Sequence, residues 1–150
     1  MTYCHEFNQA LPSNDSNDPR IILRENKSSV SALNVARNQI FIFQPDKFFT
    51  DKTACDYLLL NCMSINCWFI ELKGTDLNKA YRQITETIQH TWQYLTKTKK
   101  ANAIIVVTKV SVPDYKNTPA YLKLKKELDK RFKDKNAIKV ISRTTNIQLN

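Results

Sequence analysis

The sequence predicts an α/β protein in which a mixed central sheet is flanked by helices. Three patterns carry this prediction: short apolar runs between residues 21 and 72, a long amphipathic stretch after Asp76, and an uninterrupted β-branched run at residues 104–107. Apolar runs of this kind are typical of strands, 3–4 spacing is typical of an amphipathic helix, and a continuous β-branched run indicates a strand buried on both faces. A buried strand that is reached through a helix belongs to a mixed sheet with helices packed on it.

The elements are expected in the order β-meander, long helix, buried strand, helix and strand. A short apolar segment covers residues 21–25, and strands are expected at 29–35, 39–43, 57–61, 67–72, 103–110 and 138–141. A turn is expected near residues 36–38, a second one at 44–47 where proline ends a strand, and a hairpin connection at 63–66. The long helix begins at Thr75 or Asp76 as N-cap and ends near residues 97–100, and the second helix covers 120–132 after a loop at 113–119.

Length and composition predict one globular domain. The chain has 150 residues, of which 42% are hydrophobic, so a core of useful size is available. Residues 12–19 are polar turn formers with a proline at each end, and they read as a linker. We therefore expect an N-terminal segment with a polar linker at residues 1–19 and a single domain at residues 20–150.

The charge balance favours an anionic partner. The chain carries 23 Lys and Arg against 14 Asp and Glu, a formal charge of +9. Nucleic acid is the first candidate and an anionic membrane surface the second, while a merely basic surface stays open as the alternative. No apolar run approaches the roughly 20 residues that span a bilayer, so no membrane insertion is expected. Gly74 is the only glycine, which excludes the glycine-rich P-loop and dinucleotide fingerprints.

The four cysteines are too few for a disulfide scaffold, so we expect a cytoplasmic protein with reduced thiols. The Cys62–Cys67 spacing is not that of a zinc ribbon, and both residues are interpreted as small buried hydrophobes at hairpin ends.

Two carboxylates stand at the ends of apolar runs, where desolvation is costly. Asp56 precedes the run at residues 57–60, and Glu71 follows the run at residues 68–70. A salt-bridge cluster that stabilises the hairpin is the structural alternative. Because buried ion pairs contribute little net stability, a functional role is favoured. The two-residue period of a strand puts Glu71 and Lys73 on the same face, with Phe69.

Asp56, a hairpin, Glu71-Leu72-Lys73 and a capped helix that carries Gln83 together resemble the PD-(D/E)xK phosphodiesterase superfamily, which has the restriction-endonuclease-like fold. The resemblance covers roughly residues 20–142 as an architecture. Cys55 stands where the nominal motif of the family has proline, at a position that varies.

The resemblance implies a site for Mg²⁺ or Mn²⁺. Asp56, Glu71 and the backbone carbonyl of Leu72 would bind the ion, and Lys73 would orient the attacking water and offset phosphate charge. Gln83 resembles a helix glutamine that some members use, with a solvated helix residue as an equally open alternative. Many members add a glutamate from an N-terminal helix, for which Glu25 and Glu6 are the candidates, although the sequence shows no clear helix around Glu25. Independently, hard divalent cations prefer oxygen ligands of this kind.

The implied activity is a metal-dependent nuclease that hydrolyses phosphodiester bonds, with DNA favoured over RNA. Lys79 and Arg82 are the candidates for phosphate contact. A homodimer or a protein partner stays open, because such enzymes often act in pairs. The alternative is a catalytically silent nuclease-like fold that acts as a binding, inhibitory or regulatory protein.

Overall fold

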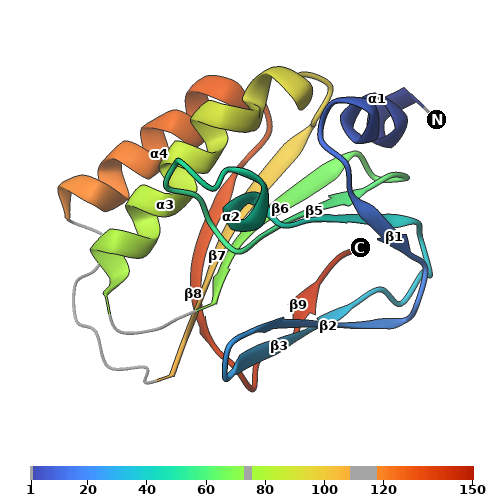
Figure 1. Ribbon diagram of the computed structural model, residues 1–150, viewed down its shortest axis with the longest axis horizontal. Helices are drawn as coiled ribbons and strands as arrows, with labels where there is room; N and C mark the ends of the chain where they lie inside the picture. Colours follow the sequence, from blue (N-terminus) through green and yellow to red (C-terminus); the bar gives the residue numbers. More distant parts are fainter. Residues whose placement is uncertain (1, 73–75, 109–117) are drawn as a thin grey trace.

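The computed structural model describes residues 2–72, 76–108 and 118–150, and it forms a mixed six-stranded sheet with helices on one face and a second sheet on the other (Figure 1). The six-stranded sheet has the order β1-β4-β5-β6-β7-β8 and consists of Asn14–Ser16, Ile40–Phe43, Tyr57–Asn61, Asn66–Leu72, Lys100–Val107 and Ala137–Ser142. The three-stranded sheet has the order β2-β3-β9 and consists of Arg20–Glu25, Ser28–Leu33 and Ile147–Gln148. The expected α/β class with a mixed sheet is confirmed.

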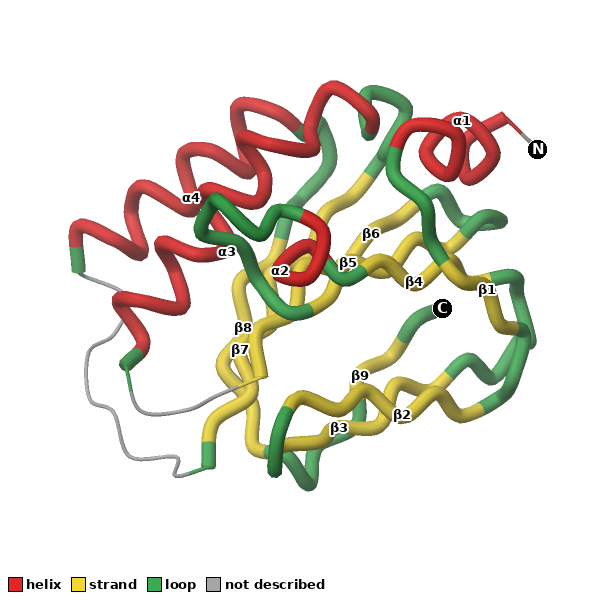
Figure 2. Tube along the Cα trace, viewed as in Figure 1, coloured by secondary structure: helices red, strands yellow, loops and turns green. Residues whose placement is uncertain are grey.

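The strand connections follow the order that the sequence predicts. β4, β5 and β6 pair antiparallel as a meander, whereas β6, β7 and β8 pair parallel. Parallel neighbours need a crossover connection, and the helices α3 (Leu77–Thr91) and α4 (Pro119–Arg131) provide the two crossovers. Figure 2 shows both helices packed along the same side of the sheet.

The central strands are buried on both faces. In β6, Cys67 and Phe69 face the core under the helices, while Trp68 and Ile70 face the core shared with the second sheet. Every residue of β5 is buried. Each large apolar side chain that is removed from water in this way contributes about 1.5–3 kcal/mol. The two-faced burial explains why these strands read as continuous apolar runs.

Helix α3 begins and packs as its sequence predicts. The Asp76 carboxylate caps it by accepting a hydrogen bond from the Lys79 N–H at 3.0 Å. Its apolar stripe, including Tyr81, Ile84 and Ile88, is fully buried. The helix ends at Thr91, and one 3₁₀ turn over Trp92–Tyr94 follows.

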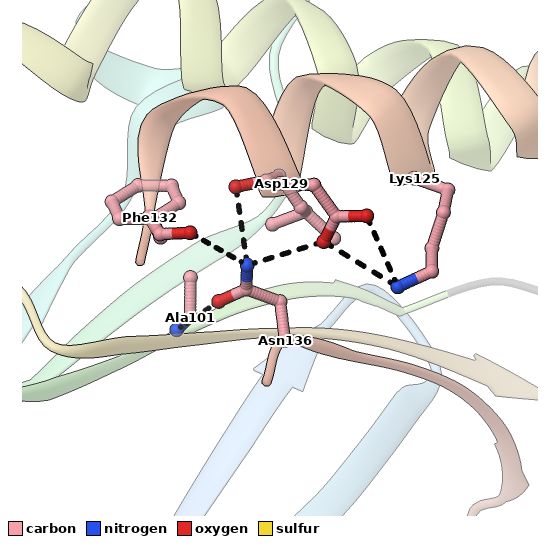
Figure 3. Close-up of polar contacts among 6 residues, drawn as sticks. Ala101, Lys125, Asp129, Phe132 and Asn136 are labelled. Carbon is pink, nitrogen blue, oxygen red and sulfur yellow. Dashed lines mark hydrogen bonds and ion pairs between the residues drawn. The ribbon is translucent and has the colours of Figure 1, made fainter. Parts of the chain in front are cut away.

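Asn136 fastens the C-terminal end of α4 to the sheet (Figure 3). Its side-chain amide donates to the carbonyl oxygens of Leu128 and Phe132, both at 3.1 Å, and its oxygen accepts from the Ala101 N–H at 3.1 Å. The Leu128 carbonyl also accepts from the Phe132 N–H at 2.9 Å. One buried side chain thus bonds to two carbonyls at the end of α4, where carbonyls run out of partners within the helix, and holds α4 against β7.

The N-terminal segment departs from the expected linker. Helix α1 (Thr2–Ala10) packs Tyr3 and Phe7 into the core under the helices. β1 lies within the expected linker and pairs antiparallel with β4. The strand has the sequence Asn-Asp-Ser and is held at the edge of the sheet through its backbone. It therefore shows no apolar alternation, and periodicity could not reveal it. The expected turn at residues 44–47 is the one-turn helix α2 (Pro45–Phe48).

Cys4 and Cys62 form a disulfide, with their Cα atoms 5.6 Å apart, so the expectation that all four thiols are reduced is wrong for this pair. Cys55 and Cys67 are free and buried, and the prediction that Cys62 and Cys67 are buried is confirmed. The bridge joins α1 to the start of the β5–β6 turn. Sequence spacing could not show it, because the two cysteines are separated by 58 positions and only the tertiary fold brings them together. Among the described helices, none is long and apolar enough to cross a membrane.

Reducing the Cys4–Cys62 bridge is expected to lower the free energy of unfolding by about 2–4 kcal/mol, because the unfolded chain gains the entropy of an open loop. Urea unfolding followed by tryptophan fluorescence, with and without dithiothreitol, measures this difference. The double variant Cys4→Ser/Cys62→Ser is the control and should be insensitive to the reductant. Four titratable thiols in the denatured, unreduced protein would contradict the bridge.

Candidate metal centre

Asp56 and Glu71 lie next to each other at the end of the β5–β6 hairpin and are held by backbone hydrogen bonds, an arrangement called here the Asp56–Glu71 lock. The register pairs Tyr57 with Ile70, which places Asp56 and Glu71 opposite each other one residue farther along. The Asp56 N–H donates to Glu71 Oε1 at 3.2 Å, and the Leu72 N–H donates to Asp56 Oδ2 at 2.7 Å. Asp56 is 3% exposed and Glu71 is 0% exposed. The two carboxylates are therefore oriented by backbone amides at the end of a buried hairpin, as the sequence predicts for their position.

Three carboxylates from three different elements converge beside this lock. One oxygen each of Glu25, Asp46 and Asp56 lies within 4.8 Å of the other two. Glu25 comes from the end of β2, Asp46 from the first turn of α2, and Asp56 from the start of β5. The oxygens Glu25 Oε2 and Asp46 Oδ1 are buried, and neither has a hydrogen-bond partner within the described residues.

This donor set fits a hard divalent cation. Buried carboxylate oxygens without a partner are uncommon, because their desolvation is not compensated. An ion such as Mg²⁺ or Mn²⁺ takes oxygen ligands from a small number of carboxylates and completes its shell with water. Glu25, Asp46 and Asp56 therefore have the chemistry and the mutual distances to hold one.

The crowding of these groups raises the pKa of Asp46 to about 6. Burial of the carboxylate is the largest cause, and the negative charges of Asp56 and Glu25 are the next. A bound proton or a bound cation would each relieve this repulsion. Binding of a divalent cation should therefore compete with protonation of Asp46.

Helix α2 brings Asp46 to the site, and the sequence analysis did not single this residue out. The Asp46 N–H donates to the Cys55 carbonyl at 3.1 Å, which joins α2 to the residue before Asp56. Pro45 occupies the first turn of α2 and lacks the N–H that a helix start leaves unpaired. The available signal was weak, because Asp46 stands three residues after the apolar strand at 40–43 and not directly beside it as Glu71 does.

Helix α3 supports the site from behind. The Cys55 N–H donates to Thr87 Oγ1 at 2.7 Å, and the Thr87 hydroxyl donates to the Gln83 carbonyl at 2.7 Å. Gln83 lies one turn before Thr87 on the same helix face and is half-buried. Burial raises the pKa of the Cys55 thiol well above its usual value, so this thiol is not a reactive nucleophile.

Of the other predicted residues, one belongs to the carboxylate cluster, three are exposed on the surface, and one is not described by the structure. Lys73 lies outside the described residues. Glu25 belongs to the carboxylate cluster, whereas Glu6 forms an exposed ion pair with Lys97 at 3.0 Å, beyond the C-terminal end of α3. Lys79 and Arg82 are exposed on α3. Comparison with protein-family models, with curated proteins and with solved structures finds no match to this chain.

Replacing Asp46 with Asn should stabilise the metal-free protein near neutral pH. The pKa of Asp46 is raised to about 6 in the folded protein, from an ordinary value of 3.8. The folded state therefore holds a proton that the unfolded state has lost between these values, and wild-type stability falls as the pH rises through that window. At pH 7.5, Asp46→Asn should unfold with a free energy about 1 kcal/mol higher than wild type, allowing for the partly exposed side chain.

Urea unfolding in EDTA at pH 3.5, 5 and 7.5 measures this effect, and the difference should shrink toward pH 3.5. Asp51→Asn, which changes an exposed carboxylate on the loop after α2, is the matched control. Equal stability of Asp46→Asn and wild type at all three pH values would contradict the repulsion.

Proposed function

We propose that this protein is a divalent-metal-dependent nuclease of the PD-(D/E)xK type, which hydrolyses phosphodiester bonds with DNA favoured over RNA. The observation that carries the proposal is the convergence of Glu25, Asp46 and Asp56 beside the Asp56–Glu71 lock. An acidic site at the end of a buried hairpin has no evident structural use, because its charges repel one another.

The arrangement of the elements supports the same proposal. The meander β4–β5–β6 is followed by α3, parallel β7, α4 and parallel β8, and this order agrees with the one expected from the resemblance. The carboxylates lie at the end of the hairpin from which α3 departs. In the proposal Glu25 takes the role of the additional glutamate, from the end of strand β2 and not from an N-terminal helix.

In this proposal Glu25, Asp46 and Asp56 hold Mg²⁺ or Mn²⁺, and Glu71 lies next to them. When bound, the ion would polarise the scissile phosphate and lower the pKa of a coordinated water. The backbone amide of Leu72 holds the Asp56 carboxylate in one orientation at 2.7 Å, and the Asp56 amide does the same for Glu71 at 3.2 Å. These fixed amides reduce the reorganisation that binding would otherwise require.

The remaining roles in the proposal belong to three basic residues that follow Glu71 along the chain. Lys73 follows Glu71 by two residues, and in the proposal it orients the attacking water and offsets charge on the phosphate. Lys79 and Arg82 are exposed on α3 and would contact phosphates of the substrate, in line with the formal charge of +9.

Cleavage assays test the activity directly. Plasmid, single-stranded and branched DNA, and RNA of matched sequence, are incubated with Mg²⁺, Mn²⁺ or EDTA. Wild type should cleave DNA only with metal, and Asp56→Asn, Glu71→Gln and Lys73→Ala should each lower the rate by about 100-fold or more. Asp51→Asn is the control and should cleave like wild type. Metal-dependent binding without cleavage of any substrate would reject the enzyme and favour the silent binding protein.

Metal binding should also stabilise the fold, whatever the substrate. A ligand that binds only the folded state at about 100 times its Kd adds about 2.7 kcal/mol to the free energy of unfolding. Urea unfolding with and without Mn²⁺ should show this gain in wild type and lose it in Asp46→Asn and Asp56→Asn. Glu6→Gln, whose carboxylate lies outside the cluster, should retain it. Equal gains in all four proteins would place the ion elsewhere.

A further inference from the structure

The cluster combines carboxylates carried by two separate sheets, so a contact between the sheets must fix their separation at that point. Asp56 directly precedes β5 of the six-stranded sheet, whereas Glu25 ends β2 of the three-stranded sheet. β2 is an edge strand, and every second residue of such a strand turns its backbone N–H and C=O away from its neighbour. Glu25 is the last residue of β2, where strands fray most readily.

The hydroxyl of Tyr57 occupies this edge. It donates to the Arg24 carbonyl at 2.7 Å and accepts from the Arg24 N–H at 3.3 Å. A single hydroxyl thus satisfies both backbone groups of one edge residue, which its combined donor and acceptor character allows. The Tyr57 ring is 8% exposed and packs in the core between the two sheets, so the hydroxyl is rigidly placed.

The two partners of this clamp are the chain neighbours of two cluster carboxylates. Tyr57 follows Asp56, and Arg24 precedes Glu25. The path Asp56–Tyr57···Arg24–Glu25 therefore sets the separation of the two backbones that carry Asp56 and Glu25. Tyr57 itself packs in the core that β5 shares with the second sheet.

We propose that Tyr57 is a positioning residue that clamps the end of β2 to β5 and so delivers the Glu25 carboxylate to Asp46 and Asp56. The inference rests on the proposed metal site for its functional consequence, but the clamp itself is measurable without metal. Tyr57 touches neither the ion nor the substrate in this scheme. It acts only through the position of Glu25.

Tyr57→Phe removes the hydroxyl and keeps the ring in the core. Isothermal titration calorimetry should show Mn²⁺ binding weakened by about 10-fold, as is common for residues that orient a ligand. In the metal-free protein, amide hydrogen exchange at Arg24 should accelerate by a similar factor. In a Glu25→Gln background, Tyr57→Phe should weaken Mn²⁺ binding no further, because the carboxylate that it positions is already gone.

Tyr3→Phe is the matched control. The Tyr3 hydroxyl is bonded to Thr98 Oγ1 at 2.8 Å, and its ring is 5% exposed, so the substitution also removes a buried hydroxyl hydrogen bond. Tyr3 lies on α1, so Tyr3→Phe should leave both Mn²⁺ affinity and Arg24 exchange unchanged. Equal effects of the two substitutions would reduce the role of Tyr57 to general stability and overturn the inference.

The remaining outcomes separate the clamp from the proposed function. Wild-type Mn²⁺ affinity in Tyr57→Phe overturns the positioning role while leaving the nuclease proposal intact. If wild type binds no metal, the proposed function fails and Arg24 exchange alone decides the clamp: acceleration in Tyr57→Phe supports it and unchanged exchange overturns it. If Tyr57→Phe does not fold, the wild-type protein can test the inference instead. If the clamp favours metal binding, then metal binding must favour the clamp by the same factor. Saturating Mg²⁺ should then slow Arg24 exchange by about 10-fold, and unchanged exchange would overturn the inference.

Discussion

The burial of the β5–β6 hairpin on both faces is the constraint on which the rest of the structure depends. Helices α3 and α4 cover one face and the three-stranded sheet covers the other, so two separate cores meet at these strands. A hairpin buried in this way can accommodate charged side chains only at its ends, where the strands leave the core. Asp56 and Glu71 stand at that end, and both remain almost fully buried. The Glu71 carboxylate accepts a hydrogen bond from the Asp56 amide, and the Asp56 carboxylate accepts one from the Leu72 amide. These bonds offset the cost of burying the two groups.

The carboxylate cluster is a local conflict within an otherwise consistent fold. Glu25 and Asp46 each bury an oxygen without a partner in the described chain, and the pKa of Asp46 rises to about 6. Such a conflict lowers stability in the absence of a cation. Proteins commonly accept this cost at functional sites, where a group must be poised for a ligand rather than satisfied by its neighbours.

The N-terminal third completes the site rather than preceding it. Helix α1 is held to the β5–β6 turn by the Cys4–Cys62 bridge, and β1 extends the sheet beside β4. β2 then crosses to the second sheet and brings Glu25 to the cluster. The hydroxyl of Tyr57 links these two halves at the point where their carboxylates meet. The site is therefore assembled from carboxylates that stand 10 to 31 residues apart along the chain.

The sequence by itself determined the central architecture and one half of the site. Uninterrupted apolar runs and 3–4 spacing depend on local burial, so β5, β6, β7, α4 and the start of α3 could be predicted within a few residues. The end of α3 could not, because the helix stops at Thr91 and not near residues 97–100. Asp56 and Glu71 could also be selected from local sequence, because a carboxylate next to an apolar run is costly to desolvate. Only the tertiary structure decided which distant groups join them. Asp46 sits in a one-turn helix, Glu25 ends an edge strand, and Cys4 meets Cys62 across 58 residues. No local pattern encodes such contacts, because they arise from the packing of two sheets against each other.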